Sequence, residues 1–370
     1  MKKLMLFITM ILMVGLLLSP GCRKSDDPET TKGKIEVILN GIPFPSETCI
    51  RIPYTLKFWE YEKEGMKLKQ ITIMDYQTRA ELLKIGEAEF GFMIRNNTKL
   101  TLFLVPTHLT NYYLSVQLPI LTGGSRPEKV LHRFEFADTV NNKTVYLEGA
   151  DITPRYNEAP MVISSPVKGD RNVFLCHSTM NYHFYLVFFD GERIGTGPRF
   201  AFDQTEVNDA MTSTFQGDPG ENKSYFNYGD TIYAAADGKV FEVRDGILEN
   251  NGNRMDHLPV SMEGVPGNYM IQDIGGGKYA FYAHMIPGTI AVKTGDNIKT
   301  GDLVGLLGNS GYSGMPHLHF NIAEGSNSFW SVGLPFVFRS CTKVGVLDQG
   351  PITPMILNNV MPEQMSVIAF

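Results

Sequence analysis

A succession of short β-prone runs, each ended by Gly, Pro or Asn, most constrains what this chain can fold into. Runs such as RIPYTLKFWEY, KQITIMDYQT and YYLSVQLPIL, rich in Ile, Val, Thr, Phe and Tyr, recur through residues 35–166, and a glycine-richer series follows. This spacing is typical of antiparallel β-sandwiches. The runs are not separated by helical periodicity, which excludes a parallel α/β fold. Only residues 78–89, TRAELLKIGEAE, are expected to form a helical turn or two, so we predict an all-β chain.

The length of 370 residues is enough for two domains, at roughly 100 to 200 residues per domain. We expect an N-terminal β-sandwich over 35–166, a second β domain with an antiparallel sheet over 167–345, and a C-terminal extension over 346–370. The first domain gathers no His, Cys or carboxylates at ligand spacing. His108 and His132 are therefore expected to be surface or strand residues rather than metal ligands.

Two segments of the second domain are predicted to be β-hairpins. Residues 229–246 contain two β-prone runs joined by Asp237-Gly238, a dipeptide suited to a tight turn. Residues 268–285 contain two more, joined by Gly275, Gly276 and Gly277.

The N-terminus predicts export. Residues 1–21 carry two lysines, an uncharged run from Leu4 to Leu18 and a small residue before Cys22, which is the pattern of a signal peptide. The run is shorter than the roughly 20 residues of a bilayer span. Its end, LLLSPGC, resembles the lipobox of bacterial lipoproteins, although Pro20 departs from it. This resemblance implies lipidation of Cys22, a membrane anchor and a location in the bacterial cell envelope; simple secretion is the alternative. Residues 22–34 are polar and would form a tether.

Net charge and cysteine content limit the class of binding partner and the state of the cysteines that we expect. Lys and Arg number 33 against 39 Asp and Glu, a net charge of -6, and no basic stripe occurs, so no nucleic-acid partner is expected. After export, Cys49, Cys176 and Cys341 would lie in an oxidising compartment, and an odd number cannot all pair. One disulfide and one buried thiol would result, with no preferred pairing.

The motif PHLHF is the sharpest chemical signal. On a strand, His317 and His319 project from one face, while Leu318 and Phe320 project toward the core. Two imidazoles so placed can serve one site, one as a metal ligand and the other as an acid or base.

Three motifs occur in a specific order: GDTIYAAADGKV, then YAHM, then GNSGYSGMPHLHFNI. Over roughly residues 195–325 they resemble the lysostaphin-type (LytM-like) zinc metallopeptidases of bacterial cell walls. The resemblance implies an antiparallel β-sheet peptidase core that hydrolyses peptide cross-links of peptidoglycan. It also implies that Asp203 and His319 are zinc ligands and that His284 and His317 are catalytic residues.

The sequence departs from that family at one ligand, because Arg199 stands four residues before Asp203 where the family has His. A guanidinium has no lone pair for a metal. Zinc is then either lost, leaving a degenerate module that binds the cell wall or activates an amidase partner, or the third ligand comes from elsewhere. His183 is the preferred candidate, because it is expected in a strand one hairpin before Asp203 and would approach Asp203 from the side if the two strands are antiparallel neighbours. His177 is the weaker candidate. The segment 170–340 is similar to a branch of the family with this Arg and an upstream His.

With three protein ligands, zinc keeps an open position for a water whose pKa falls to about 7. His284 and His317 would then divide proton transfer and oxyanion stabilisation between them. The sequence does not decide which residue has which role.

Overall fold

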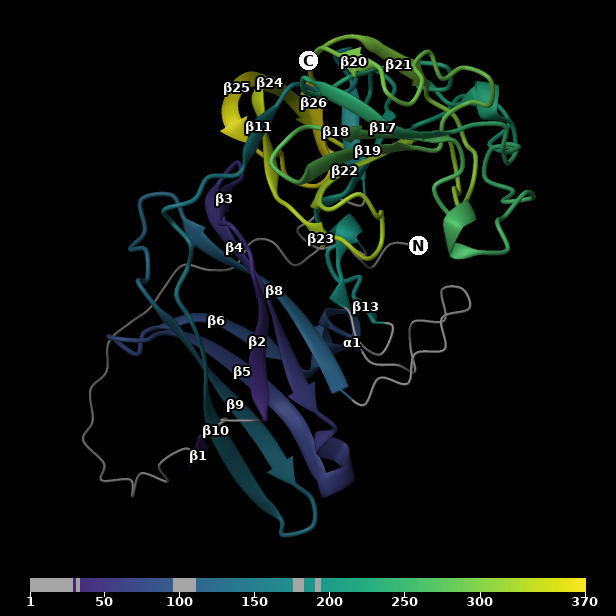
Figure 1. Ribbon diagram of the computed structural model, residues 1–370. Helices are drawn as coiled ribbons and strands as arrows, with labels where there is room; N and C mark the ends of the chain where they lie inside the picture. Colours follow the sequence, from purple (N-terminus) through teal and green to yellow (C-terminus); the bar gives the residue numbers. More distant parts are fainter. Residues whose placement is uncertain (1–28, 31–33, 96–110, 176–182, 190–193) are drawn as a thin grey trace.

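The computed structural model describes residues 29–30, 34–95, 111–175, 183–189 and 194–370 (Figure 1). Strands dominate both halves of this described part, and the pairing is almost entirely antiparallel, which confirms the all-β prediction. Among the described residues, no helix is long and apolar enough to span a bilayer. The expected signal peptide, Cys22 and most of the tether lie outside the described residues.

The N-terminal half is a sandwich of two sheets. The first has the strand order β1 (Glu29–Thr30), β10 (Lys143–Ile152), β9 (Val130–Asp138), β5 (Met66–Asp75) and β6 (Glu81–Gly86). The second has the order β2 (Ile35–Asn40), β4 (Cys49–Trp59), β8 (Asn111–Leu121) and β7 (Ile94–Arg95), with β3 (Phe44–Pro45) against β4. Inward-facing rings fill the space between the sheets: Phe58 of β4 and Phe134 of β9 are fully buried, with centroids 5.5 Å apart.

The predicted helix at 78–89 is displaced along the chain. The Asp75 carboxylate accepts the amides of Gln77 and Thr78, and this turn directs the following residues back as β6 beside β5. The helix α1 (Glu87–Met93) begins only afterwards, where the side chain of Glu89 accepts the amide of Gly86. A short 3₁₀ helix, η1 (Tyr61–Glu64), precedes β5.

A twelve-stranded sheet organises the C-terminal half. Its order is β11 (Met161–Ile163), β24 (Phe336–Val346), β26 (Ser366–Ala369), β12 (Asn172–Leu175), β15 (Phe202–Glu206), β22 (Leu318–Glu324), β19 (Lys278–Ala283), β18 (Tyr269–Asp273), β17 (Gly238–Arg244) and β20 (Asn297–Ile298). β23 (Val332–Gly333) pairs with β22, and β25 (Gly350–Val360) pairs with β24.

Two small sheets and three 3₁₀ helices complete this half. The sheets pair β13 (Phe188–Phe189) with β14 (Ile194–Gly195), and β16 (Thr231–Tyr233) with β21 (Leu303–Leu306). The 3₁₀ helices are η2 (Gly197–Phe200), η3 (Asn222–Ser224) and η4 (Met262–Gly264).

The hairpin predicted at 268–285 is confirmed, and the one at 229–246 is wrong. β18 and β19 pair across three glycines that all have positive φ, which only Gly adopts readily. In the other segment, β16 pairs with β21, while β17 pairs with β18 and β20. The Asp237 carboxylate accepts the Thr300 amide, so it fixes the adjoining loop rather than closing a two-strand turn.

Segments far apart in sequence join the two halves. Residues 346–370, expected as an extension, supply β25 and β26 to the large sheet, and β11 enters it beside β24. Lys343 is ion-paired with the buried carboxylate of Glu47 at 2.5 Å, and Arg51 with Glu363 at 2.7 Å. Figure 1 shows β3 reaching from the sandwich toward β11 and β24.

The cysteines in the described part are reduced. Cys49 and Cys341 are buried free thiols. Cys176, the third cysteine considered for a disulfide, lies outside the described residues.

Candidate metal centre

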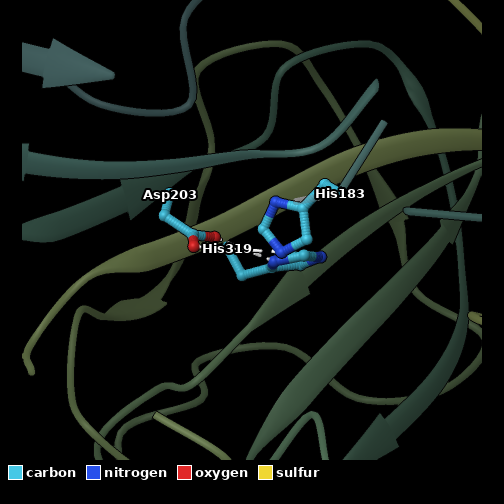
Figure 2. Close-up of side chains that lie close together, drawn as sticks. All are labelled: His183, Asp203 and His319. Atoms are coloured by element: carbon cyan, nitrogen blue, oxygen red, sulfur yellow. Dashed lines mark hydrogen bonds and ion pairs between the residues drawn. The ribbon is translucent and has the colours of Figure 1, made fainter. Parts of the chain in front are cut away.

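Three side chains with metal-binding atoms converge at the centre of the large sheet. The candidate ligand atoms of His183, Asp203 and His319 all lie within 4.8 Å of one another. His319 Nδ1 is 3.0 Å from Asp203 Oδ1, and His183 Nε2 is 3.9 Å from Asp203 Oδ2. Figure 2 shows the carboxylate and the two imidazoles turned toward one another. We refer to these three residues as the triad.

Strand register brings two members of the triad together. β22 lies between β15 and β19, and its His319 is opposite Asp203 on one side and Ala283 on the other. Leu318 and Phe320 are fully buried on the opposite face, as the alternation predicts. Asp203, His319 and Ala283 therefore lie side by side on three adjacent strands, and His284 is the residue after Ala283.

His183 reaches the triad from a turn rather than from the predicted strand. Its carbonyl accepts the amide of Leu186, and the next side chain, Phe184, is only 1% exposed. The rings of His183 and His319 meet edge to face with centroids 4.9 Å apart. The predicted proximity to Asp203 is therefore observed with a different local backbone.

The electrostatics of the triad favour a carboxylate anion. Burial acts to raise the pKa of Asp203, but the neighbouring His183, His317 and His319 outweigh it and hold that pKa well below its usual range. Asp203 is thus available as an ionised ligand at neutral pH.

The triad can supply three of the four ligands of a tetrahedral metal ion. Two imidazole nitrogens and one carboxylate oxygen form a donor set that zinc accepts, and ligands of a tetrahedral zinc lie about 3.3 Å apart. The observed separations of 3.0 and 3.9 Å bracket that value. A cavity of about 590 Å³ opens onto the triad, so a fourth position can be reached by water or substrate.

Two further imidazoles face the same cavity. His284 Nδ1–H donates to the Ser310 carbonyl at 2.7 Å, and His317 Nδ1–H donates to the Met315 carbonyl at 2.8 Å. These bonds fix the tautomers and leave each Nε2 available; that of His317 is 3.5 Å from Asp203 Oδ1. The two rings lie 4.7 Å apart between centroids.

The pKa values of these two histidines shift in opposite directions. Burial, reinforced by His317 and His319, lowers the pKa of His284 well below its usual value. Burial also acts to lower the pKa of His317, but the adjacent Asp203 carboxylate raises it overall. The backbone of His284 is left-handed, with φ +67°, at the point where the chain leaves β19.

Comparison with known families assigns the central part of this half. Residues 224–329 match the model of peptidase family M23. These residues form an M23 peptidase domain. The match contains His284, His317 and His319, whereas Asp203 and His183 precede it.

Solved structures give local likenesses to the M23 domain. A variant of the catalytic domain of the prophage-encoded M23 protein EnpA from Enterococcus faecalis is 24% identical, with 33% of this chain and 85% of that chain covered and a TM-score of 0.22. The catalytic domain of lysostaphin from Staphylococcus simulans is 23% identical, with the same coverages and TM-score. A protein from Pseudomonas aeruginosa assigned to peptidase M23 is 12% identical over 76% of this chain and 90% of its own, with a TM-score of 0.25. Comparison of the sequence with curated proteins gives no match.

Arg199 does not join the triad. Its guanidinium donates from Nη1 to Thr55 Oγ1 at 2.8 Å and from Nη2 to the Tyr54 carbonyl at 2.7 Å, both on β4 of the sandwich. Burial lowers the pKa of Arg199 to about 9, so it remains charged at neutral pH. The position at which the resemblance implied a ligand is therefore occupied by a residue that contacts the other half of the molecule.

The remaining histidines lie apart from the M23 site or outside the described part. His132, expected to be a surface or strand residue, is on β9 and fully buried: its Nδ1 bonds to the Ala150 carbonyl and its Nε2 to the Tyr54 hydroxyl. His257 lies beside Asp256. His108 and His177 are outside the described residues.

Sequence reasoning missed the aromatic wall of the cavity. Phe188 packs against Phe329 and Trp330, with ring centroids 5.3 and 6.1 Å away, and all three line the cavity. These residues come from two separate segments without a motif, so the sequence contains no signal that joins them.

Proposed function

We propose that this chain is a zinc metalloendopeptidase that hydrolyses peptide cross-links of bacterial peptidoglycan. The observation that carries the proposal is the convergence of the triad with His284 and His317 on one cavity of an M23 domain. The triad would hold the ion. Bound zinc would supply a Lewis acid and an activated water at its open position.

The chain's own residues would supply the rest of the chemistry. Because the Nδ1 atoms of His284 and His317 are occupied by backbone carbonyls, their Nε2 atoms are the groups able to accept a proton from an attacking water or donate one toward the substrate. General acid–base groups placed in this way contribute about 10²- to 10⁴-fold to a rate.

The cavity supports a peptide rather than a small metabolite as substrate. Its apolar and aromatic lining, including Phe188, Phe329 and Trp330, would exclude water and pack along an extended chain. Peptidoglycan is proposed from the resemblance of the motifs to cell-wall peptidases.

Export and lipid anchoring at Cys22 belong to the same proposal. They would place the enzyme in the cell envelope, where its substrate lies, with residues 22–34 as a tether to the membrane.

A catalytically degenerate module that activates an amidase is the less favoured function. It is motivated by Arg199, whose guanidinium cannot bind a metal and whose charge would repel a nearby zinc ion. In the structure that guanidinium is hydrogen-bonded to β4 of the sandwich, so it supplies no reason for loss of the metal.

Metal analysis and hydrolysis together test the proposal. Purified protein lacking residues 1–21 should carry about one zinc per chain and release peptides from peptidoglycan; His257→Ala, a change of an exposed histidine away from the triad, serves as the control. Protein that binds no zinc and leaves every cell-wall peptide intact would overturn it.

A further inference from the structure

Arg199 is a charged side chain that crosses the boundary between the two halves. It lies on η2 of the C-terminal half, is 3% exposed, and places its two terminal nitrogens on β4 of the sandwich. Its acceptors are themselves fixed: Tyr54 and Thr55 are fully buried, and Thr55 Oγ1 lies 3.1 Å from Ser115 Oγ on the neighbouring strand.

The contact uses the shape of the guanidinium rather than a charge pair. Among the described residues no carboxylate is ion-paired with Arg199, and its Nε has no hydrogen-bond partner. A planar fork that reaches two acceptors on adjacent residues is a geometry that lysine cannot reproduce. Burying an unpaired cation costs free energy, so packing around the group has to hold it in place.

The same guanidinium also contacts the segment that carries a triad member. Arg199 Cζ lies 4.5 Å from the centroid of the Phe184 ring, within the range of a cation–π contact. Phe184 is 1% exposed and also meets Phe200, the residue after Arg199, at 5.9 Å. Phe184 directly follows His183, so its ring anchors the turn from which His183 reaches Asp203.

We propose that Arg199 is a positioning residue that fixes His183: it holds the Phe184 ring while it is itself hydrogen-bonded to strand β4 of the N-terminal sandwich, an arrangement that we call the clamp. The sandwich thereby becomes part of the metal site without contributing a ligand. This inference rests on the proposed function, because it concerns the affinity of the triad for zinc.

A matched pair of substitutions tests the clamp in the full mature protein. Arg199→Met removes both hydrogen bonds and the cation–π contact while keeping an unbranched side chain. Arg51→Met is the control, because Arg51 also lies on the sandwich strand β4 and also binds the other half, through Glu363, but does not touch Phe184. Zinc affinity is measured by competition with a chelator, and hydrogen exchange is followed in peptides covering residues 183–189.

Arg199→Met should weaken zinc binding at least 10-fold and increase exchange in residues 183–189, in metal-free protein as well. Arg51→Met should change zinc affinity less than twofold and leave that exchange unaltered, even if both variants melt at lower temperature. If Arg199→Met does not fold, Thr55→Val, which deletes one acceptor, should give the same two changes at about 3-fold in affinity.

Equal effects of Arg199→Met and Arg51→Met on zinc affinity would overturn the clamp, as would unchanged exchange in residues 183–189 of the Arg199→Met variant. Failure of the proposed function is distinguishable: wild-type protein would then bind no zinc, and the increase in exchange of the Arg199→Met variant would still be measured in the metal-free state. That result would support the contact between Arg199 and Phe184 as a restraint on residues 183–189, but it would overturn the role of this contact at a metal site.

Discussion

Both halves of the molecule bury histidines, but they use the rings differently. In the sandwich, both nitrogens of His132 are occupied, one by the Ala150 carbonyl and the other by the Tyr54 hydroxyl. In the M23 domain, His284 and His317 are nearly as buried and line the cavity, and each Nδ1 is held by a backbone carbonyl. The Nε2 of His317 lies 3.5 Å from Asp203 Oδ1 of the triad. Burial and a shifted pKa therefore do not distinguish the two kinds of histidine. The partner of the second nitrogen does, because it is a core hydroxyl for His132 and a triad carboxylate for His317.

The largest expected effect is that of His319→Ala. Removing a triad nitrogen should reduce the zinc content from about one per chain to near zero and abolish hydrolysis, because two remaining ligands hold zinc poorly. Elemental analysis and a peptidoglycan-release assay measure both. Retention of stoichiometric zinc would show that the ligand set has been misassigned.

His317→Ala should separate metal binding from turnover. Because Nε2 of His317 is assigned to proton transfer, kcat should fall by about 10²- to 10⁴-fold while most of the zinc is retained. Zinc content and kcat are measured on the same preparation. Loss of zinc equal to that of His319→Ala would place His317 among the ligands instead.

His132→Leu should lower stability and leave zinc binding unchanged. It leaves the Tyr54 hydroxyl and the Ala150 carbonyl buried without their partner, at a cost on the order of 3 kcal/mol in the free energy of unfolding. Urea denaturation measures this loss. Zinc stoichiometry of the folded variant should equal that of the wild type, and a variant with depleted zinc would break the distinction between the two kinds of histidine.

Acid should destabilise the protein through the same residue. Burial lowers the pKa of His132 to about 4, below the ordinary value of 6.5, so between these values the unfolded chain binds a proton that the folded chain does not. Above about pH 6.5 neither state binds this proton, so His132 has no effect on the pH dependence there. As the pH falls from about 6.5 to 4, proton binding by the unfolded chain lowers the free energy of unfolding. The loss between pH 7 and pH 5 should be about 2 kcal/mol.

Denaturation of the wild type and of His132→Leu, each at pH 7 and at pH 5, isolates the contribution of His132 to this loss of stability. The variant should lose correspondingly less stability on acidification. An identical pH dependence in the two proteins would mean that His132 is already protonated, or already exposed, in the native state.

Local pattern was sufficient to predict the parts of the site that depend on neighbouring residues. The alternation around His317 and His319 predicted their shared face, and three glycines predicted the β18–β19 turn, at the end of β19 opposite His284. The prediction that His183 approaches Asp203 came from an expected strand one hairpin before Asp203, with support from a family resemblance, and the structure has a turn at His183 instead of that strand. No local rule describes such a turn, because it is held by Phe184 packing against Arg199.

Contacts between distant segments could not be predicted. The direction of Arg199 depends on acceptors 144 and 145 residues earlier in the chain. Likewise, the Asp237-Gly238 dipeptide favours a tight turn, but β16 finds a better partner in β21, about 70 residues later. In each case the sequence shows which contacts a residue is able to make, and the fold of the whole chain decides which of them it makes.

The pairing of β12 with β26 also sets an order of events during biosynthesis. β12 lies directly against β15, the strand that carries Asp203, and Asn172 of β12 bonds to the Ile368 carbonyl, 196 positions later. A nascent chain can therefore complete the sheet beneath the triad only after almost the whole C-terminal half has been synthesised. The triad would be among the last features to form, which separates its assembly in time from that of the sandwich.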